Sequence, residues 1–270
     1  MNNDINGRLK HALDNVTENG LRDLFAFNGI DHTKSGRDTM SHQLIHIDTD
    51  DFVTQHLTFA SDYVWDNLNR RFHNLLIDKA EELACAGEEN SEFGCVSGLI
   101  FERRVHQVMC AWRKSVRARI LTVKGGFAST LSGHVEIALQ EITGRAVFSD
   151  LSELERMKPG IYYRPRSRRF PAIDSLVLLH ERLYLFQMTI AEHHGVQSDD
   201  LARVLDRVNA YKQAYLVFVT HPAKSGTYRA QNYLTKQRRI AKRVNEKVEK
   251  LSQLVFGVGP RMFAAARDKV

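Results

Sequence analysis

The sequence has no long apolar run. The longest uninterrupted apolar stretch among its 270 residues is far shorter than the roughly 20 residues that a helix needs to cross a membrane. The first residues, Met1 to Lys10, are polar and contain no apolar signal core. We therefore expect neither a membrane span nor an export signal in this chain.

Cysteine is also scarce, and one nucleotide-binding motif is missing. The three cysteines, Cys85, Cys95 and Cys110, are an odd number at wide spacing, which fits neither a disulfide framework nor a zinc knuckle. We interpret them as reduced structural thiols. The phosphate loop GxxxxGK[ST] does not occur in the chain, so ATP hydrolysis is not expected.

The sequence does contain enough apolar residues for a folded core. Hydrophobic residues make up 43% of the chain and charged residues 26%, which indicates one large or two small globular domains. A polar stretch at 87–91 (GEENS) has the composition of a boundary. We therefore predict a smaller accessory region of mixed secondary structure at 1–90 and a main domain at 91–270.

The net charge of +6 conceals an uneven distribution. Residues 1–95 hold 8 Lys and Arg against 17 Asp and Glu, whereas the rest of the chain holds 30 against 15. A segment with such an excess of positive charge attracts polyanions and neutralises phosphates, so nucleic acid is the first partner to consider. An anionic membrane surface is the second, and charge alone does not separate the two.

The spacing of apolar residues predicts the elements of the first half. Ser61 is a good N-cap for a helix over 61–87, and a second helix is expected over about 92–117. A short strand at 42–48 precedes them. A short helix near 134–142 follows them.

The second half changes to strands. Runs rich in aromatic and β-branched residues predict strands at 160–165, 172–179 and 182–191, with His180 and Glu181 closing a tight hairpin between the last two. A helix at 200–212 and a buried strand at 214–219 follow. The order of helix, three strands, helix and strand predicts an α/β fold with a mixed central sheet flanked by helices.

Polar residues interrupt two of these apolar strands. Asp174 lies near the beginning of one strand, where a buried charge is costly unless it is paired or binds a metal. Gln187 interrupts the next strand, and alternation puts Thr189 on the same face. Hairpin pairing can bring that face beside Asp174, and Glu102 from the long helix would supply a second carboxylate. Oxygen ligands on rigid backbone suit a hard divalent metal that hydrolyses phosphodiesters.

Three segments in this order resemble a known family. The segments are GLIFERRVH, YYRPRSRRFPAIDSLVLL and LFQMTIAEHHGV. They resemble the nuclease domain of the Crinkler and retrotransposon-hot-spot (RHS) proteins, a branch of the PD-(D/E)xK restriction-endonuclease-like superfamily, over roughly 95–225. The upstream pieces HQLIHID and FASDYVWDNL are similar to the end of the ATPase module that precedes the nuclease in those proteins.

The resemblance implies a restriction-endonuclease-like fold and a metal-dependent nuclease that binds Mg²⁺ or Mn²⁺. It implies that Glu102 is the helix-borne acid, Asp174 the metal-binding aspartate and Gln187 the third ligand or positioning group. Thr189 stands where many superfamily members have a lysine, and a threonine hydroxyl cannot supply that positive charge. His194 matches a histidine of the family pattern that would orient water or contact a phosphate.

Basic residues surround these positions in the sequence. Lys124, Arg164 and Arg166 are candidates to replace the missing lysine charge. Further basic residues predict phosphate contacts without sequence specificity: Arg168, Arg169, Lys236, Arg238, Arg239, Lys242 and Arg243. The resemblance implies DNA as the substrate. It also implies an effector or retroelement-associated protein that acts in the nucleus, which is the host nucleus if the protein is secreted.

Other interpretations stay open from the residues. A catalytically weak or inactive nucleic-acid- or chromatin-binding module on a nuclease fold is the main alternative, because Gln187 and Thr189 depart from the family pattern. Glu102 and His106, four residues apart on a helix, would permit a different metal site with His193 or His194. Basic adhesion to a membrane or an acidic partner is the third interpretation.

Overall fold

The computed structural model describes residues 2–19, 44–49, 55–72, 75, 91–121, 133–167, 170, 172–208 and 210–267. The chain forms two compact units, Met1–Ile100 and Phe101–Val270. The boundary falls inside helix α6 (Ser91–Ala111). In the described part of the chain, no helix has both the length and the apolar character that a membrane crossing requires.

Besides part of α6, the described residues of the first unit form two helices and a two-stranded sheet. Its elements are α1 (Asn2–Asp14), β1 (Ile45–Thr49), β2 (Gln55–Phe59) and α4 (Asp62–Arg71), with β1 antiparallel to β2. The Ser61 hydroxyl accepts a hydrogen bond from Val64 N at 3.2 Å, as expected of an N-cap. Trp65, Leu68 and Leu44 contribute to a small separate core. Helix α4 ends at Arg71, and residues 76–87 of the predicted helix lie outside the described residues.

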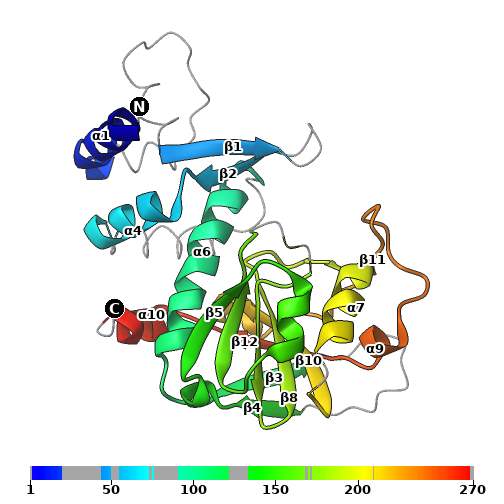
Figure 1. The fold of residues 1–270 in the computed structure, drawn as a ribbon. Helices are drawn as coiled ribbons and strands as arrows, with labels where there is room; N and C mark the ends of the chain where they lie inside the picture. Colours follow the sequence, from blue (N-terminus) through cyan, green and yellow to red (C-terminus); the bar gives the residue numbers. More distant parts are fainter. Residues whose placement is uncertain are drawn as a thin grey trace. The chain divides into compact units, whose positions relative to one another are not determined.

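The second unit is built on an eight-stranded mixed sheet (Figure 1). Its strands in chain order are β3 (Val116–Leu121), β4 (His134–Ile137), β5 (Gly144–Phe148), β6 (Ile161–Pro165), β7 (Ser175–Leu179), β8 (Arg182–Met188), β10 (Gln213–Thr220) and β12 (Ser252–Gly257). Across the sheet they are ordered β4-β3-β12-β10-β8-β7-β6-β5. The prediction of a mixed central sheet flanked by helices is therefore confirmed.

Smaller elements complete the second unit. They are two 3₁₀ helices, η1 (Leu139–Glu141) and η2 (Leu151–Arg156), the short parallel pair β9 (Val196–Gln197) and β11 (Tyr233–Leu234), and the helices α7 (Ser198–Arg207), α8 (Pro222–Ser225), α9 (Glu246–Glu249) and α10 (Pro260–Arg267).

The centre of the sheet follows the predicted element order. Strands β6, β7 and β8 form an antiparallel meander, and helix α7 then carries the chain to β10, which lies parallel to β8. His180 and Glu181 close the β7–β8 hairpin with positive φ angles of 47° and 58°, as a type I′ turn requires. The predicted hairpin is confirmed.

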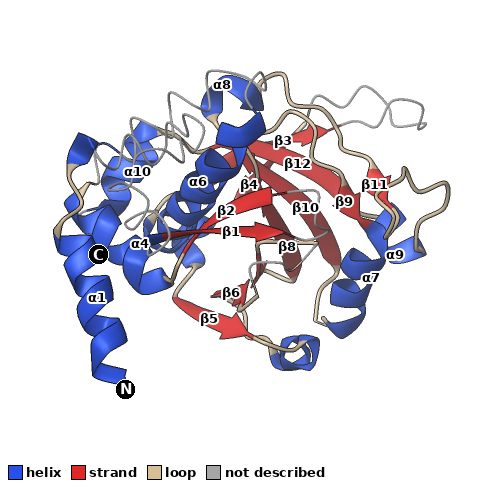
Figure 2. Ribbon diagram, turned by 90° about the horizontal axis from the view of Figure 1, so that it is seen from above, coloured by secondary structure: helices blue, strands red, loops and turns tan. Residues whose placement is uncertain are grey.

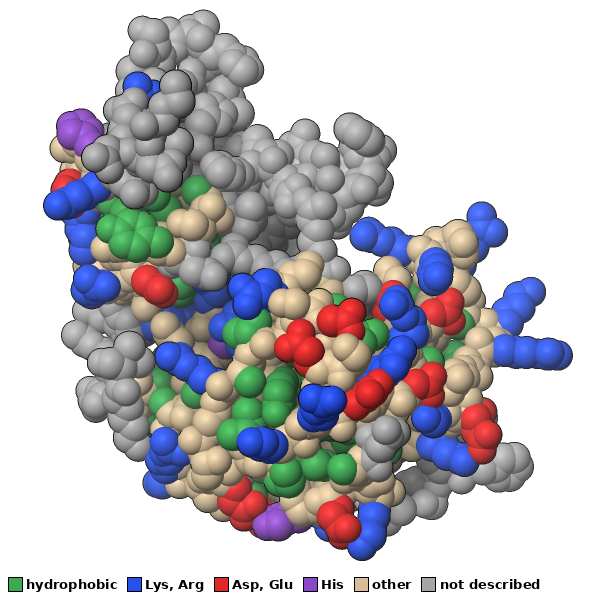
Figure 3. All heavy atoms as spheres, in the orientation of Figure 1, with side chains coloured by type: hydrophobic (Ala, Val, Ile, Leu, Met, Phe, Trp, Pro, Cys, Tyr) green, Lys and Arg blue, Asp and Glu red, His purple; other side chains and the backbone are tan. Residues whose placement is uncertain are grey.

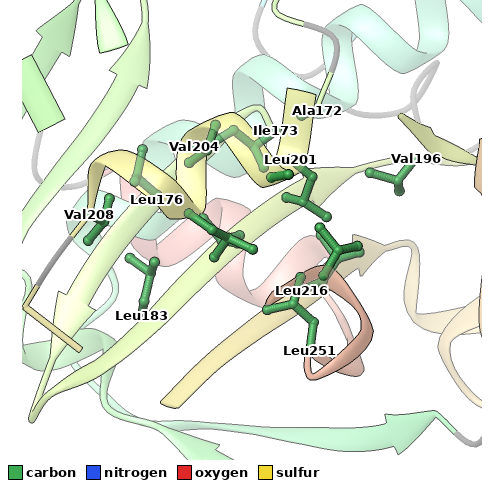
Figure 4. Close-up of a cluster of buried hydrophobic side chains, with 14 of the residues drawn as sticks. Ala172, Ile173, Leu176, Leu183, Val196, Leu201, Val204, Val208, Leu216 and Leu251 are labelled. Atoms are coloured by element: carbon green, nitrogen blue, oxygen red, sulfur yellow. The ribbon is translucent and has the colours of Figure 1, made fainter. Parts of the chain in front are cut away.

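The two faces of the sheet carry different helices. Leu201, Val204 and Leu205 of α7 pack against side chains such as Leu176 and Leu185 on one face (Figure 4). His106 of α6 contacts Tyr162 of β6 on the other face, with 2.8 Å between His106 Nδ1 and the Tyr162 hydroxyl. Figure 2 shows the sheet between α6 and α7. This layering leaves β7 and β8 buried in the middle of the sheet.

Two sequence predictions are wrong. Helix α6 ends at Ala111 instead of continuing to residue 117, because 116–121 forms β3, whose Ala118 and Leu121 are buried between β12 and β4. Residues 134–142 form β4 and η1 instead of one helix. Residues 116–120 (VRARI) and 134–137 (HVEI) alternate between apolar and polar or basic side chains, which is the pattern of a strand and not of a helix.

Candidate functional site

Asp174 and Gln187 lie side by side where the β7–β8 hairpin ends. The backbone N–H of Asp174 donates to Phe186 O at 2.9 Å, and the Asp174 carboxylate accepts from Met188 N at 2.5 Å. Phe186 and Met188 flank Gln187 in β8, so both hydrogen bonds place Asp174 directly beside Gln187. The neighbourhood that hairpin pairing predicts is present.

Gln187 has an unsatisfied oxygen. Its side chain is buried, and its Oε1 atom has no hydrogen-bond partner among the described residues. Buried side-chain oxygens without a partner are uncommon in proteins and call for an explanation, because the lost hydration costs free energy. An oxygen aimed at a ligand is one such explanation.

Glu102 of α6 shares the electrostatic environment of Asp174. Burial raises the pKa of the Asp174 carboxyl well above its usual value, and the negative charge of Glu102 raises it further. The hydrogen bond from Met188 N and the positive charge of Arg164 act in the opposite direction but do not cancel the rise. The carboxylates of Asp174 and Glu102 repel each other and are partly shielded from water, so a bound cation would stabilise their charged forms.

A buried pair of side chains holds Glu102 against the sheet. His106 Nε2 lies 3.4 Å from Glu102 Oε1, and Tyr162, which bonds to His106 on its other ring nitrogen, is fully buried. Burial lowers the pKa of His106, and the hydrogen bond with Glu102 opposes that shift. The neutral imidazole therefore bridges Glu102 and β6. The alternative metal site on Glu102 and His106 gains no third ligand, since the described residues include no metal-binding group of three or more His, Cys, Asp and Glu side chains.

Thr189 is engaged in the backbone. Its N–H donates to Val219 O at 2.9 Å, and its hydroxyl accepts from Ala191 N at 3.1 Å. The side chain is buried and stabilises the turn that follows β8. A threonine held in this way does not supply what a lysine would at this position.

His194 lies further along the same loop. Its backbone N–H donates to Gln231 Oε1 at 2.6 Å, and burial lowers the pKa of its half-buried imidazole. No hydrogen bond or ion pair in the described part of the chain joins His194 to Glu102, Asp174 or Gln187. The structure therefore places Asp174 beside Gln187, with Glu102 near enough to act electrostatically on Asp174.

The candidates for the missing positive charge differ in position. Arg164, in β6, acts electrostatically on Asp174, His106 and Tyr162, which places it beside the carboxylates. Arg166 is exposed and donates to Ser149 Oγ at 2.8 Å. Lys124, Arg168 and Arg169 lie outside the described residues.

The remaining predicted phosphate contacts share one surface loop. The loop between β11 and α9 carries five exposed basic side chains: Lys236, Arg238, Arg239, Lys242 and Arg243. On the side of β11 and α9, Figure 3 shows several Lys and Arg side chains projecting into solvent. Not every basic or aromatic residue near these runs is available, since Arg103, Arg104 and Tyr228 are buried.

Sequence reasoning did not single out Lys224. This lysine of α8 donates from Nζ to Ile190 O at 2.6 Å, directly after Thr189. It also lines a cavity of about 260 Å³ together with Glu192, His193 and Arg229. In the sequence, the one clue was that Lys224 follows His221 and Pro222, which end a predicted strand. The contact between Lys224 and Ile190 O itself depends on the fold.

Comparison with known proteins adds no relative. No protein-family model, curated protein or solved structure matches the chain.

Proposed function

We propose that this protein is a metal-dependent nuclease of the restriction-endonuclease-like type, similar to the Crinkler and RHS nuclease domains, that hydrolyses phosphodiester bonds of DNA. The observation that carries the proposal is the Asp174–Gln187 pair at the end of the β7–β8 hairpin, with Glu102 acting on Asp174 from helix α6. The order of α6, the β6–β8 meander, α7 and parallel β10 supports it, because this is the core order expected of that fold. A nuclear site of action follows from the resemblance alone.

The side chains at this place suit Mg²⁺ or Mn²⁺. Two carboxylates and an amide oxygen are hard oxygen ligands, and the buried Gln187 Oε1 has no other partner in the described structure. Glu102, Asp174 and Gln187 would hold the ion. When bound, such an ion polarises a phosphoryl oxygen and favours a hydroxide nucleophile near neutral pH.

Groups of the protein itself hold the proposed metal ligands in position. Met188 N–H fixes the Asp174 carboxylate against β8, and the His106–Tyr162 pair holds Glu102 against β6. Arg164 supplies a positive charge beside the carboxylates, where it would stabilise the negative charge that develops on a phosphate in the transition state. Lys224, tied to Ile190 O, provides a second cation at the end of β8.

A second function has its own support. Gln187 brings no charge, and the Thr189 hydroxyl already accepts a hydrogen bond from Ala191 N, so the site lacks both the usual carboxylate and the usual lysine. These two features favour a weak or inactive nucleic-acid- or chromatin-binding module on the same fold.

Plasmid cleavage separates the two functions. The nuclease proposal expects the purified protein to nick supercoiled DNA with Mg²⁺ or Mn²⁺, and expects Asp174→Ala to lose at least about 100-fold in rate while still binding DNA, since a group that stabilises transition-state charge is worth this much. Asp199→Ala, which removes an exposed aspartate of α7, is the matched control and should cut as the wild type does.

Gln187→Glu sharpens the same test. An added carboxylate beside Asp174 should increase metal affinity and lower the Mn²⁺ concentration needed for half-maximal cutting. Intact DNA and RNA at every metal concentration, with the wild type and with Gln187→Glu, would overturn the enzyme proposal and leave the binding module.

A further inference from the structure

The chain 234–243 forms a closed hairpin on the surface of the second unit. Leu234 and Ile240 form an antiparallel bridge, and Ala241 N donates to Tyr233 O at 2.8 Å. At the tip, Arg238 N donates to Thr235 O at 2.9 Å and Thr235 N to Arg239 O at 2.8 Å. Arg238 has φ 57°, as in a three-residue hairpin loop that ends in a left-handed residue. We call residues 234–243 the basic hairpin.

The hairpin is anchored at its base. Strand β11 pairs with β9, with Tyr233 opposite Val196, on the segment that leaves β8 and the candidate site. A Cβ atom at Gly195 would lie 2.5 Å from Leu234 Cδ1, so the close packing of Leu234 requires glycine there. A hydrogen-bonded and packed hairpin is ordered before it meets a partner, which reduces the entropy lost on binding.

The surface of the hairpin combines positive charge with an exposed apolar residue. The segment from Leu234 to Asn245 contains five basic residues and no acidic one. Ile240 is 65% exposed, the most exposed of the large hydrophobic residues in the described part of the chain. Charge complementarity points to a polyanion, and Ile240 points to an apolar group within it.

We propose that the basic hairpin enters the major groove of double-stranded DNA, with its cations on the phosphates of the groove walls and Ile240 against thymine methyl groups. The proposal rests on the proposed function for its nucleic-acid partner and adds that the partner is duplex DNA. The major groove of B-form DNA is about 12 Å wide and admits a two-stranded ribbon, and the thymine methyl is the apolar group exposed there. The major groove of A-form RNA is too narrow for side chains to read, so an RNA duplex should bind more weakly.

Binding is measured on the full chain in EDTA, so that no cleavage interferes. The probes are A·T-rich duplexes of roughly 20 base pairs, or two helical turns: one with thymine, one with every thymine replaced by uracil, and an RNA duplex of the same sequence. We expect the thymine duplex to bind at least about tenfold tighter than the RNA duplex. Loss of one contacted methyl should weaken wild-type binding about fourfold.

The variants assign these effects to residues. Ile240→Ala should weaken binding to the thymine duplex severalfold and leave binding to the uracil duplex unchanged. The double variant Lys236→Ala/Arg239→Ala should make the plot of log K against log salt less steep by about 1.8. Each lost phosphate contact removes about 0.9 from the magnitude of that negative slope. Val147→Ala and Lys212→Ala, which alter an exposed valine and an exposed lysine elsewhere in this unit, should change neither quantity.

Three results would overturn the proposal: equal affinity for the RNA duplex, an Ile240→Ala effect that is the same on thymine and uracil duplexes, or tighter binding to vesicles of anionic phospholipid than to DNA. These results are independent of cleavage. A protein that binds through the hairpin but never cuts with Mg²⁺ or Mn²⁺ would refute only the nuclease, whereas one that cuts normally after Ile240→Ala and Lys236→Ala/Arg239→Ala with unchanged binding would refute only the hairpin's role.

Discussion

Asp174 shows how one residue can weaken the fold that carries it. Burial and the nearby Glu102 raise the pKa of the Asp174 carboxyl, so the folded protein binds a proton there more readily than the unfolded chain does. Stability therefore falls as the pH rises from the pKa of the unfolded chain toward that of the folded protein. At neutral pH, Asp174→Asn removes this cost and keeps an oxygen for Met188 N. We expect the melting temperature in EDTA to rise by a few degrees, on the order of 1 kcal/mol.

Thermal unfolding with added Mn²⁺ provides the matching observation. A cation that binds only the folded protein stabilises it, so the wild type should gain stability with Mn²⁺ and Asp174→Asn should not. Asp206→Asn, at an exposed aspartate paired with Lys247, is the control and should show no gain in EDTA. A destabilised Asp174→Asn variant would mean that the carboxylate supports the fold.

At the scale of single residues, the sequence predicted which side chains are neighbours better than it predicted their hydrogen bonds. Asp174 and Gln187 stand out because each interrupts an apolar strand, and strand pairing makes neighbours of them. The contact between Lys224 and Ile190 O and the turn made by the Thr189 hydroxyl depend on loops whose paths no local pattern encodes. Roles that rest on such contacts could not be predicted.

Elements that bury both faces were the easiest to predict. The apolar runs of β7, β8 and β10 are long, β-rich and bounded by turn residues, so they appear clearly in the sequence. Strands β3, β4 and β5 lie toward the sheet edges and contain polar or charged residues among few buried apolar ones, so they have no apolar run like those of the central strands. Strand β12 is apolar over Leu254–Phe256, but it is too short to be distinguished from a helix segment by periodicity.

The turn between β7 and β8 stores strain that substitution should release. His180 and Glu181 both have positive φ, which costs a residue with a Cβ atom roughly 1–2 kcal/mol. Asn and Gly are the residues favoured in such a turn. His180→Asn/Glu181→Gly should therefore raise the free energy of unfolding by about 1–2 kcal/mol.

Urea unfolding followed by fluorescence measures this change. The exposed ion pairs of His180 with Glu141 and of Glu181 with Lys212 are lost in the variant, but such pairs contribute little. His180→Ala/Glu181→Ala loses the same pairs and keeps the strain, so it serves as the control and should show no gain. Equal midpoints for the two double variants would show that the turn is not strained.

For the whole molecule, the order of the elements predicted the class of fold but not the size of the sheet. The acidic N-terminal and basic C-terminal segments correspond to separate compact units, with the boundary inside α6. An uninterrupted helical pattern gives no signal of such a boundary. The eight-stranded order arises because β12 and β3 extend the sheet beyond β10, and those pairings join residues far apart in the chain.

The histidines of the second unit make its stability depend on pH. Burial lowers the pKa of His106, His194 and His221 below the usual value of 6.5. In the unfolded chain these side chains gain a proton as the pH falls below that value, whereas in the folded protein they resist protonation. Stability should therefore be highest above pH 6.5 and decrease as the pH falls toward the folded pKa values, by at most about 1.4 kcal/mol per pH unit for each histidine.

Urea unfolding at a series of pH values between 5 and 7.5 tests this in the Asp174→Asn background, because ionisation of Asp174 contributes with the opposite sign in the wild type. His106→Gln should flatten the curve, since glutamine has no proton to gain. Val147→Ala, at an exposed valine that carries no titratable proton, is the control and should leave the curve unchanged. Stability that was independent of pH in this range would mean that folding does not lower the pKa of these histidines. Stability that rose as the pH fell would mean that the folded protein favours the charged imidazoles, including that of His106 beside Glu102.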